Sequence, residues 1–277
     1  MPVMTSIPIL TSKGEFVEAK KIITLRHLLT HTAGFWYSLD ELRLQAFNQI
    51  DWTYEDRPRL FEAGDKWQYG TSLEWVGEII QNISGDDLET YFRKNITGPL
   101  NMKSTWFNVP NILEENIVSW GNRDSTGFEE YDRIPTEPVT YYNGGGGLFG
   151  SPKDYLYFLI CIMNNGKYEG GQILKPETIE LMYENQLPNG LTLTLGGELT
   201  KSDTHGLAWE IEESKDEMVR SKGSVYWGGG ANSFYSLDKK NDVSIVYFTN
   251  YFPWMDKETY DFYRLFEKEV YDETNRN

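Results

Sequence analysis

The C-terminal part of the chain most constrains its fold, because strand-like segments there follow one another without an intervening helix. Three segments, 206–212, 224–238 and 243–250, are rich in β-branched and aromatic residues and are bounded by glycine or polar turns. The polar turn 239–242 joins the last two. Successive strands with short connections predict an antiparallel sheet, and the amphipathic segment 256–270 predicts a helix that covers it.

The residues before this sheet are mainly helical in pattern. The clearest helix is "TSLEWVGEIIQNISG", residues 71–85, in which Thr71 and Glu74 have the spacing of a capping box and Gly85 provides the stop. Apolar residues recur on one face of this helix, which predicts a buried stripe made of Val76, Ile79, Ile80 and Ile83.

Three shorter helices are predicted from their terminal signals. Thr24 can cap a helix that ends before Gly34, and Ser151 followed by Pro152 opens another after the glycine run 144–147. A third is expected within 175–186. Together these patterns predict an α+β fold in a single domain over 1–277. A mainly helical lobe occupies 22–200, and the antiparallel sheet with its C-terminal covering helix occupies 201–277.

Charge and composition exclude several classes of partner. The chain has 26 Lys and Arg against 42 Asp and Glu, a formal charge of −16, and such a field repels phosphate backbones and anionic lipid. No apolar run reaches the roughly 18 residues of a membrane span. We therefore expect no nucleic-acid and no membrane partner. The only cysteine, Cys161, lies in an apolar run and is expected in the core.

The N-terminus lacks the features of a secretory signal peptide. This predicts a cytoplasmic location if Met1 is the true start, and a periplasmic or secreted location if a leader has been lost. The sequence leaves both alternatives open.

Two of the three histidines, His27 and His31, have the i, i+4 spacing that would place them on one helical face. A zinc protease helix needs a glutamate after the first histidine, where this chain has Leu28, and a third ligand. His205 is distant in sequence and nothing ties it to the pair. The glycine run 144–147 lacks the Lys-Ser/Thr of a phosphate-binding loop. We therefore expect structural histidines, no metal and no cofactor.

Two other segments have residues that could act on a carbonyl. Tyr69 immediately precedes the predicted helix at 71–85, whose positive dipole end, with nearby cations, favours a phenolate and hence a general base. Three glycines at 228–230 interrupt a predicted strand, where bare backbone N–H groups could bind an oxyanion. Each segment alone is also compatible with an ordinary structural role.

In chain order, five segments resemble the serine β-lactamase-related family, which contains class C β-lactamases, DD-peptidases and family VIII carboxylesterases. They are "ITLRHLLTHTAGF", "AGDKWQYGTSLEWVGEIIQNISG", "GPLNMKST", "GGGGLFGSPKDYLYF" and "YWGGGANSFYSLD", between Ile22 and Asn250. The resemblance implies a β-lactamase/transpeptidase-like fold. It also implies acyl transfer, in which a serine on a Ser-x-x-Lys helix attacks an ester or amide carbonyl.

The resemblance assigns roles to residues by position. Tyr69 takes the place of the second-motif tyrosine, the general base, and Gly230 would offer the oxyanion N–H. Thr71 stands where many relatives have asparagine, and Trp227-Gly228-Gly229 replaces the Lys-Thr-Gly third motif. The loop after the first helix is expected at the pocket rim. The implied substrate contacts are Thr71, Trp227, Gly228, Gly229, Trp36 and Tyr37.

The third motif departs from the family pattern because it begins with tryptophan instead of lysine. A penicillin carboxylate would lose its usual cation there, so we expect small esters or amides as substrates, with esters favoured over β-lactams. Lys222 is an alternative cation, although it lies further from the hairpin turn than the motif requires.

The chain also departs from the family pattern at the nucleophile, since we expect no serine of this chain to take that role. Ser12 directly precedes Lys13, and Ser151 is one residue too close to Lys153. In the family the nucleophile helix lies upstream of "LLTHTAG", where this chain has only residues 1–21. The resemblance thus implies that the N-terminal part of the domain, with the nucleophile and part of the sheet, is missing.

Three hypotheses follow from these observations. The chain is a truncated serine hydrolase that is inactive in this form, or a non-catalytic relative (a pseudoenzyme) that keeps the pocket as a binding module. A metal-dependent hydrolase at His27 and His31 is the least favoured. Loss of strands and a helix would expose a sheet edge, so we also expect self-association through that edge.

Overall fold

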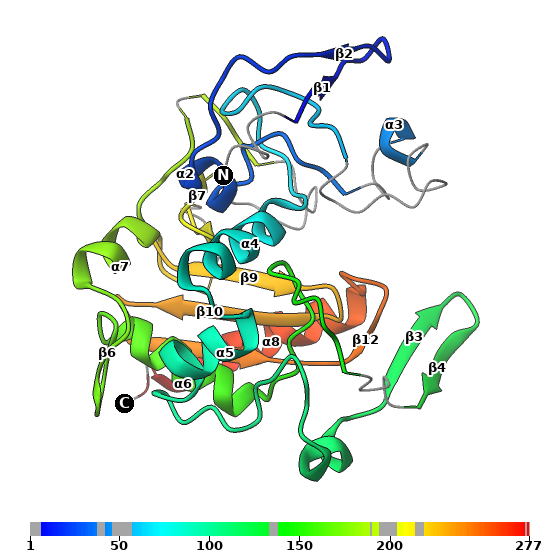
Figure 1. Ribbon diagram of the computed structural model, residues 1–277. Coiled ribbons are helices and arrows are strands. Elements are labelled where there is room, and N and C mark those ends of the chain that lie inside the picture. The colour runs from blue at the N-terminus through cyan, green and yellow to red at the C-terminus, as the bar shows by residue number, and fades with distance from the viewer. Residues whose placement is uncertain are drawn as a thin grey trace.

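A computed structural model of the protein describes residues 7–37, 42–45, 57–132, 138–188, 190–193, 204–213, 219–274 and 276. At the centre of the fold is a five-stranded antiparallel sheet with strand order β11-β10-β9-β8-β7 (Figure 1). Its strands are β7 (Thr204–His205), β8 (Glu210–Ile211), β9 (Val225–Gly229), β10 (Ser233–Asp238) and β11 (Val243–Tyr247). The predicted C-terminal antiparallel sheet is confirmed.

The segment 224–238 is a hairpin of two strands, and the prediction of one continuous strand is wrong. Gly229 pairs with Ser233, so Gly230, Ala231 and Asn232 form the turn between β9 and β10. Asn232 has a φ of 57°, a left-handed conformation that asparagine tolerates better than most residues. The three glycines therefore lie at the end of a strand and in its turn.

The Asn232 side chain ties this turn to the segment after β12 (Tyr251–Phe252). Its Nδ2 donates to the carbonyl oxygens of Tyr251 and Pro253 at 2.9 and 2.8 Å, and its Oδ1 accepts from the Asp256 N–H at 3.1 Å. Asn232 is fully buried, so these three bonds hold the turn and segment 251–256 together without competition from water.

Helices cover both faces of the sheet (Figure 1). On one face, Leu159 and Ile162 of α6 (Pro152–Met163) and Ile179 of α7 (Pro176–Tyr183) pack with Val225 and Leu237. On the other face, α8 (Lys257–Thr274) packs its buried tyrosines against apolar side chains of β10 and β11. Neighbouring β10 residues point alternately to these two layers, as the strand period of two requires. The covering C-terminal helix is confirmed.

The helical lobe lies above the edge formed by β9 and β7, in the view of Figure 1. It contains β1 (Ile9–Leu10), β2 (Phe16–Val17), α2 (Leu25–Leu29), α3 (Leu42–Gln45) and α4 (Ser72–Ser84). Further along the chain are α5 (Leu88–Phe92), a π-helical turn (Arg93–Thr97), a 3-10 helix (Asn111–Asn116), β3 (Trp120–Asp124), β4 (Gly127–Tyr131), β5 (Lys167–Tyr168) and β6 (Gly171–Gln172). β3 pairs antiparallel with β4 and parallel with β12.

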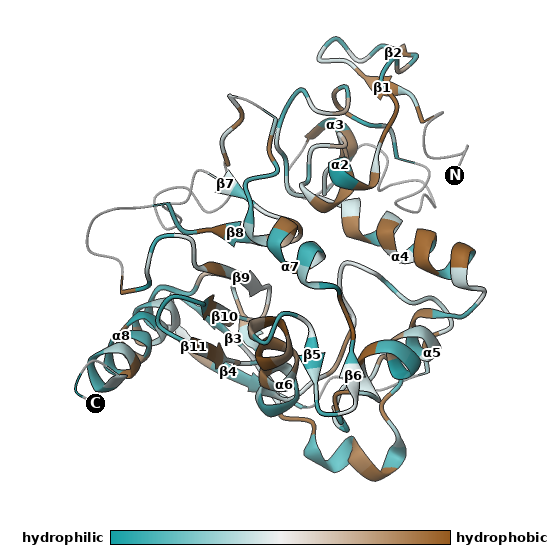
Figure 2. Ribbon diagram, turned by 90° about the vertical axis from the view of Figure 1, so that its left-hand side faces the viewer, coloured by the Kyte–Doolittle hydropathy of each residue, from teal (hydrophilic) through white to brown (hydrophobic). Residues whose placement is uncertain are grey.

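Helix α4 exists as predicted and is followed by Gly85 in the left-handed conformation, but its predicted buried stripe holds only in part, since Val76 and Ile79 pack half-buried against the core. The buried residues are Ser72, Glu74, Trp75 and Gly77, whereas Ile83 is 82% exposed. Gly77 allows the backbone of Gly144 to approach so closely that a Cβ would lie 3.0 Å from its Cα. The face around Gly77 is therefore buried, while hydrophobic residues recur along the whole of α4 (brown in Figure 2).

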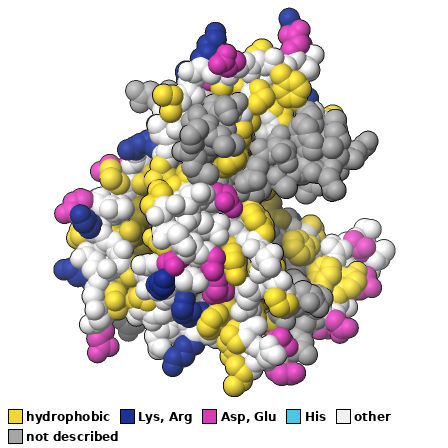
Figure 3. Space-filling view, viewed as in Figure 1, with side chains coloured by type: hydrophobic (Ala, Val, Ile, Leu, Met, Phe, Trp, Pro, Cys, Tyr) yellow, Lys and Arg dark blue, Asp and Glu magenta, His cyan; other side chains and the backbone are white. Residues whose placement is uncertain are grey.

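The space-filling view shows hydrophobic side chains among acidic and basic ones on one side of the molecule (Figure 3). In the part of the chain that the structure describes, no helix combines the length and hydropathy needed to cross a membrane.

Candidate active site

Tyr69 is positioned by the close approach of its loop to the segment after α2. Gln68 donates its backbone N–H to the His31 carbonyl oxygen at 2.9 Å. A Cβ on Gly70 would lie 2.5 Å from the Phe35 oxygen and from the Trp36 Cα, so only glycine fits there. These contacts fix Tyr69 just before the first turn of α4.

The Tyr69 ring joins an aromatic cluster between the helical lobe and the sheet. Its centroid lies 4.7 Å from that of His31, 5.4 Å from Tyr37 and 5.5 Å from Trp227 of β9. The structure thus brings together the second-motif tyrosine and the first residue of the third motif, which the resemblance placed in one site.

The pKa of Tyr69 is raised, which contradicts the expectation that the helix dipole favours a phenolate. Burial is the largest cause and the negative charge of Glu74 adds to it, whereas hydrogen bonds with Tyr37 and Trp227 act in the opposite direction. Burial penalises the charged form of a phenol, and the partial charge at one helix end does not compensate for it here. Tyr69 is therefore a neutral phenol at pH 7 in this structure.

Glu74, which sequence reasoning treated only as a capping residue, belongs to this site. It is 4% exposed, and its Oε1 accepts a hydrogen bond from the Tyr37 hydroxyl at 3.1 Å. Thr71 is the N-cap residue but makes no side-chain capping bond, so the predicted capping box is wrong. A Cβ on Gly145 would lie 2.7 Å from the Glu74 carboxyl carbon. The glycine run thus makes room for a buried carboxylate, a contact that no local pattern reveals.

The third-motif glycines differ in their surroundings. A Cβ on Gly228 would meet the Phe234 ring at 3.1 Å, whereas one on Gly230 would meet only the Phe252 ring at 3.8 Å. Gly229 and Gly230 are exposed. Strand β8 pairs only with Val225 and Tyr226, so no described strand covers the remaining edge of β9. Gly230, to which the resemblance assigns the oxyanion N–H, lies one residue beyond this edge, in the turn between β9 and β10.

The other expected substrate contacts lie in different surroundings. Tyr37 contacts Tyr69 and Glu74 as described above, whereas Trp36 packs against a separate apolar cluster. That cluster consists of Leu10, Leu44, Leu60 and Phe61. Thr71 is buried beside Tyr69.

The structure corrects the expectation for the histidines. Thr24 caps α2 as predicted, with His27 completing a capping box. The helix ends at Leu29, and His31 has a φ of 53°, so His27 and His31 do not share a helical face. Instead His31 and His205 meet, with ring centroids 5.9 Å apart. Burial holds the pKa of His31 well below its usual value and lowers that of His205 to about 4. Among the described residues, no group of three side chains could hold a metal ion.

One serine does have a lysine three residues later, contrary to the expectation that none would. Ser236 and Lys239 have this spacing, but Ser236 lies in strand β10 and its Oγ donates to Glu267 at 3.0 Å, whereas Lys239 lies beyond the strand end. The spacing brings two side chains together on a helix and not on a strand. Ser151 caps α6, and Lys222 pairs with Glu213 at 2.8 Å. None of these serines is placed as a nucleophile for Tyr69.

Comparison with known proteins identifies the chain's relatives. The Beta-lactamase family model matches residues 2–269. Monacolin J acid methylbutanoyltransferase of Aspergillus terreus is 28% identical, over 98% of this chain and 73% of the relative. Lovastatin esterase of Penicillium rubens is 23% identical, over 80% of this chain and 62% of the relative. A mutant of the Aspergillus terreus simvastatin synthase has a similar structure, with a TM-score of 0.89 and 27% identity over 100% of this chain and 75% of that one.

Proposed function

Because this chain belongs to the Beta-lactamase family, we propose that it forms part of an acyl-transfer site of the esterase type, acting on a small ester or amide. The observation that carries the proposal is the contact between Tyr69 and Trp227, whose ring centroids lie 5.5 Å apart across the two lobes. Carbonyl chemistry requires a proton-transfer group on one side of the substrate and backbone N–H groups that stabilise the oxyanion on the other.

The neutral third motif supports esters over β-lactams. Trp227 cannot pair with a carboxylate, and Lys222 is engaged with Glu213. The relatives named above include a methylbutanoyltransferase and an esterase, and both names describe chemistry at an ester bond. We therefore infer an uncharged acyl group next to Trp227.

In the proposed reaction, a nucleophilic hydroxyl oxygen bonds to the carbonyl carbon while Tyr69, as phenolate, takes the hydroxyl proton. The carbonyl electron pair moves to oxygen, where the Gly230 N–H stabilises the negative charge. When the tetrahedral intermediate collapses, Tyr69 returns the proton to the leaving alcohol. Neither Ser151 nor Ser236 lies in position to supply that hydroxyl.

We further propose that this polypeptide alone forms no acyl-enzyme. Its Tyr69 is neutral at pH 7, because burial and Glu74 raise the phenol pKa. A lysine beside the phenol, as in the family's Ser-x-x-Lys pair, would oppose both effects. The same observation favours the alternative of a non-catalytic module that binds an ester without cleaving it.

Two measurements on the purified chain test these proposals separately. In a heteronuclear NMR titration with methyl butanoate, we expect the Trp227 indole N–H to shift, with Trp227→Phe giving the assignment and penicillin G giving no shift. A shift with penicillin alone, or with neither compound, would overturn the ester site. Intact-mass analysis after fluorophosphonate treatment should show no adduct. A stoichiometric adduct would show that the chain has its own nucleophile.

A further inference from the structure

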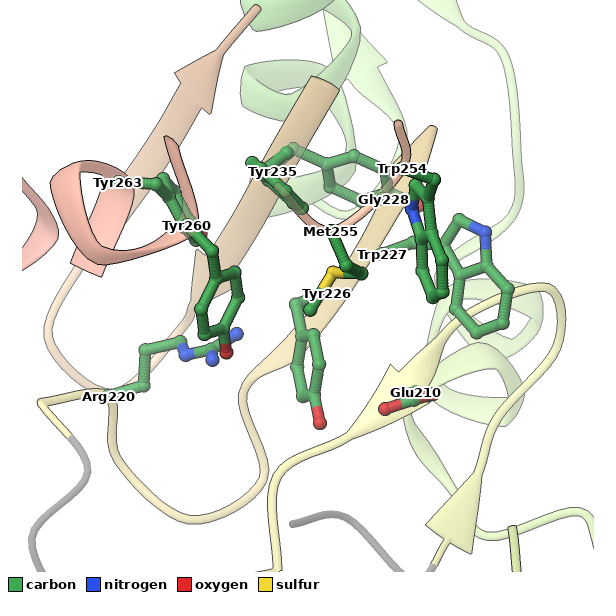
Figure 4. A pocket seen from close by; sticks show the side chains of 11 residues that line it. Glu210, Arg220, Tyr226, Trp227, Gly228, Tyr235, Trp254, Met255, Tyr260 and Tyr263 are labelled. Atoms are coloured by element: carbon green, nitrogen blue, oxygen red, sulfur yellow. The ribbon is translucent and has the colours of Figure 1, made fainter. Parts of the chain in front are cut away.

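A second pocket lies mainly on the face of the sheet opposite to Tyr69, and Trp227 and Tyr235 also contribute to its lining. Trp227 points to the Tyr69 cluster, so its neighbours Tyr226 and Gly228 point to the other face, toward α8. Its empty space of about 460 Å³ includes open solvent at the mouth, so a ligand bound there would be only partly enclosed. Figure 4 shows it between β9, α8 and the segment that follows β12.

The walls of this pocket are mainly aromatic. Tyr226 and Phe234 come from the sheet, Tyr260 and Tyr263 from α8, and Trp254 with Met255 from the segment after β12 (Figure 4). Gly228 contributes no side chain, which allows the Phe234 ring to pack directly against its backbone. Aromatic faces of this kind attract cations through their quadrupoles.

Glu210 of β8 is the charged group in this wall that lacks a counter-charge. It is 1% exposed, no described cation forms an ion pair with it, and its Oε2 has no hydrogen-bond partner among the described residues. Its hydrogen-bond partner is Tyr226, directly opposite on β9. A buried carboxylate oxygen without a partner costs free energy that a ligand donor would recover.

Arg220 also lines the pocket, but its charge is already compensated. Its Nε lies 3.3 Å from Glu267 Oε1, its Nη2 lies 3.9 Å from Glu212 Oε2, and its guanidinium stacks 4.0 Å over the Tyr226 ring. Its Nη1 makes no hydrogen bond to a described residue. Arg264 pairs with Glu267 as well. Among the described residues, three buried carboxylates (Glu210, Glu212 and Glu267) thus face two guanidinium groups, and Glu210 is the carboxylate that makes no ion pair.

From this geometry we propose that the pocket binds a small organic cation, an ammonium group on an aromatic or aliphatic body. The ammonium would donate to Glu210 Oε2, and the body would lie against Trp254, Met255 and Tyr260. An organic carboxylate is disfavoured, because it would bring a fourth negative charge to a cluster with two positive ones. This proposal does not depend on the acyl-transfer function.

The pH dependence of binding follows from the groups around Glu210. Burial raises its pKa to about 7, against the opposing effects of the Tyr226 hydrogen bond and Arg220, and Glu212 raises it further. Tyr260 of α8 also lines the pocket, and Glu267 of α8 lies next to it through its ion pair with Arg220. The empty site therefore loses its proton around pH 7, and a cation binds only the ionised form. Affinity should rise about tenfold between pH 6 and pH 8.

The experiment is calorimetric titration of the unmodified protein with benzylammonium, and with benzyl alcohol and phenylacetate as neutral and anionic probes. We expect benzylammonium to bind at least tenfold more tightly than either, with the tenfold rise from pH 6 to pH 8. Equal affinity for the three probes, or an affinity independent of pH, would overturn the proposal. Tighter binding of phenylacetate would contradict it as well, and would show that Arg220 is the anchor.

Two variants test whether benzylammonium binds at Glu210. Glu210→Gln keeps the shape and the acceptor for Tyr226 and should lower benzylammonium affinity at pH 8 at least tenfold. The matched control is Glu213→Gln, three residues further along the same segment and paired with Lys222 outside the pocket, which should leave affinity unchanged. Loss of affinity in both variants would contradict the assignment of Glu210 as the residue that binds the ammonium group. If Glu210→Gln fails to fold, the comparison of the three probes on the unmodified protein still tests the proposal.

Discussion

Tyr226 and Trp227 are neighbours on β9, yet they enter two different environments. Trp227 joins Tyr69, His31 and His205 in a cluster where burial keeps the ionisable groups neutral. Tyr226 instead lies under the Arg220 guanidinium and donates to Glu210. One face of the strand thus buries neutral polar rings, and the other buries charged groups, of which Arg220 is paired and Glu210, among the described residues, is not. Because side chains alternate along a strand, two adjacent residues can lie in chemically different environments.

The largest effect is expected where a buried charge would lose its partner. Glu267→Gln removes the carboxylate that pairs with both Arg220 and Arg264 and accepts from Ser236. Leaving Arg220 buried without that partner should lower the free energy of unfolding by about 3 to 5 kcal/mol. Urea denaturation measures the change. A loss below about 1 kcal/mol would show that the ionic face does not depend on this pair.

Truncation of an apolar side chain on the face covered by α6 and α7 provides the comparison with Glu267→Gln. Leu237 is fully buried and packs with Ile162, Ile179 and Val225, so Leu237→Ala should cost about 2 to 5 kcal/mol, of which part is the cavity left behind. The two variants should differ in salt dependence, because only the Glu267 change alters electrostatics. Identical responses to about 1 M NaCl would contradict the division into an apolar and an ionic face.

The pH dependence of stability should differ between two buried carboxylates. The folded-state pKa of Glu210 is raised to about 7, so its stabilising contribution is complete below the unfolded value near 4.5 and is lost as pH rises through 7. Burial also acts on Asp238, but hydrogen bonds from Ser221 and Tyr271 lower its pKa to about 2. Its contribution is complete above about pH 4 and is lost as pH falls through 2.

Glu210→Gln removes the loss of stability that Glu210 causes as pH rises through 7. It leaves unchanged the loss that Asp238 causes at acid pH. We expect the variant to be about 3 kcal/mol more stable than the original protein at pH 8 and little different at pH 4.5, as measured by thermal unfolding at both values. Asp238→Asn is the control, and it should flatten only the acid limb below pH 4. A Glu210→Gln variant that is less stable than the original protein at pH 8 would contradict the expected direction of the effect.

A smaller effect is expected at Tyr69. Burial is the main cause of the raised Tyr69 pKa and the charge of Glu74 adds to it, so Glu74→Gln should lower that pKa. Ultraviolet difference titration against Tyr69→Phe isolates this one phenol. Glu78→Gln, on the same helix and outside the contacts of Tyr69, should leave the titration unchanged. An unchanged Tyr69 pKa in Glu74→Gln would remove Glu74 from the site.

The smallest effect is expected at the β11 edge, which both faces share. In the described part of the sheet β11 pairs only with β10, and Phe262 of α8, 59% exposed, lies 5.8 Å from Tyr247 of β11 between ring centroids. We propose that two copies associate there. Phe262→Lys should weaken self-association in sedimentation velocity, whereas Ile112→Lys, exposed on the 3-10 helix, should not. Equal sedimentation of both variants and the original would exclude this edge.

Local signals made much of the fold predictable. Thr24, Ser151 and Gly85 set helix ends in the structure as their sequence context indicates, because caps satisfy backbone groups within a few residues. The pairing of Tyr69 with the third motif came from the resemblance and not from any local pattern, since it joins residues on different lobes.

Other features depended on contacts that the sequence does not display. The buried face of α4 is selected by the approach of Gly144 to Gly77, which overrides the isoleucine stripe. Glu74 can be buried only because Gly145 has no side chain. The meeting of His31 with His205 requires the lobe and the sheet to be packed together. In each case tertiary packing decided between choices that local propensity left open.

The Asn232 side chain couples the two sites on β9. It belongs to the turn that contains Gly230, and its three hydrogen bonds reach the segment that carries Trp254 and Met255. We expect a ligand that displaces Trp254 to strain these three hydrogen bonds, and so to disturb the turn at which we propose the oxyanion N–H. Any change in affinity that one site then causes at the other is matched by the same factor in the reverse direction, as thermodynamic reciprocity requires.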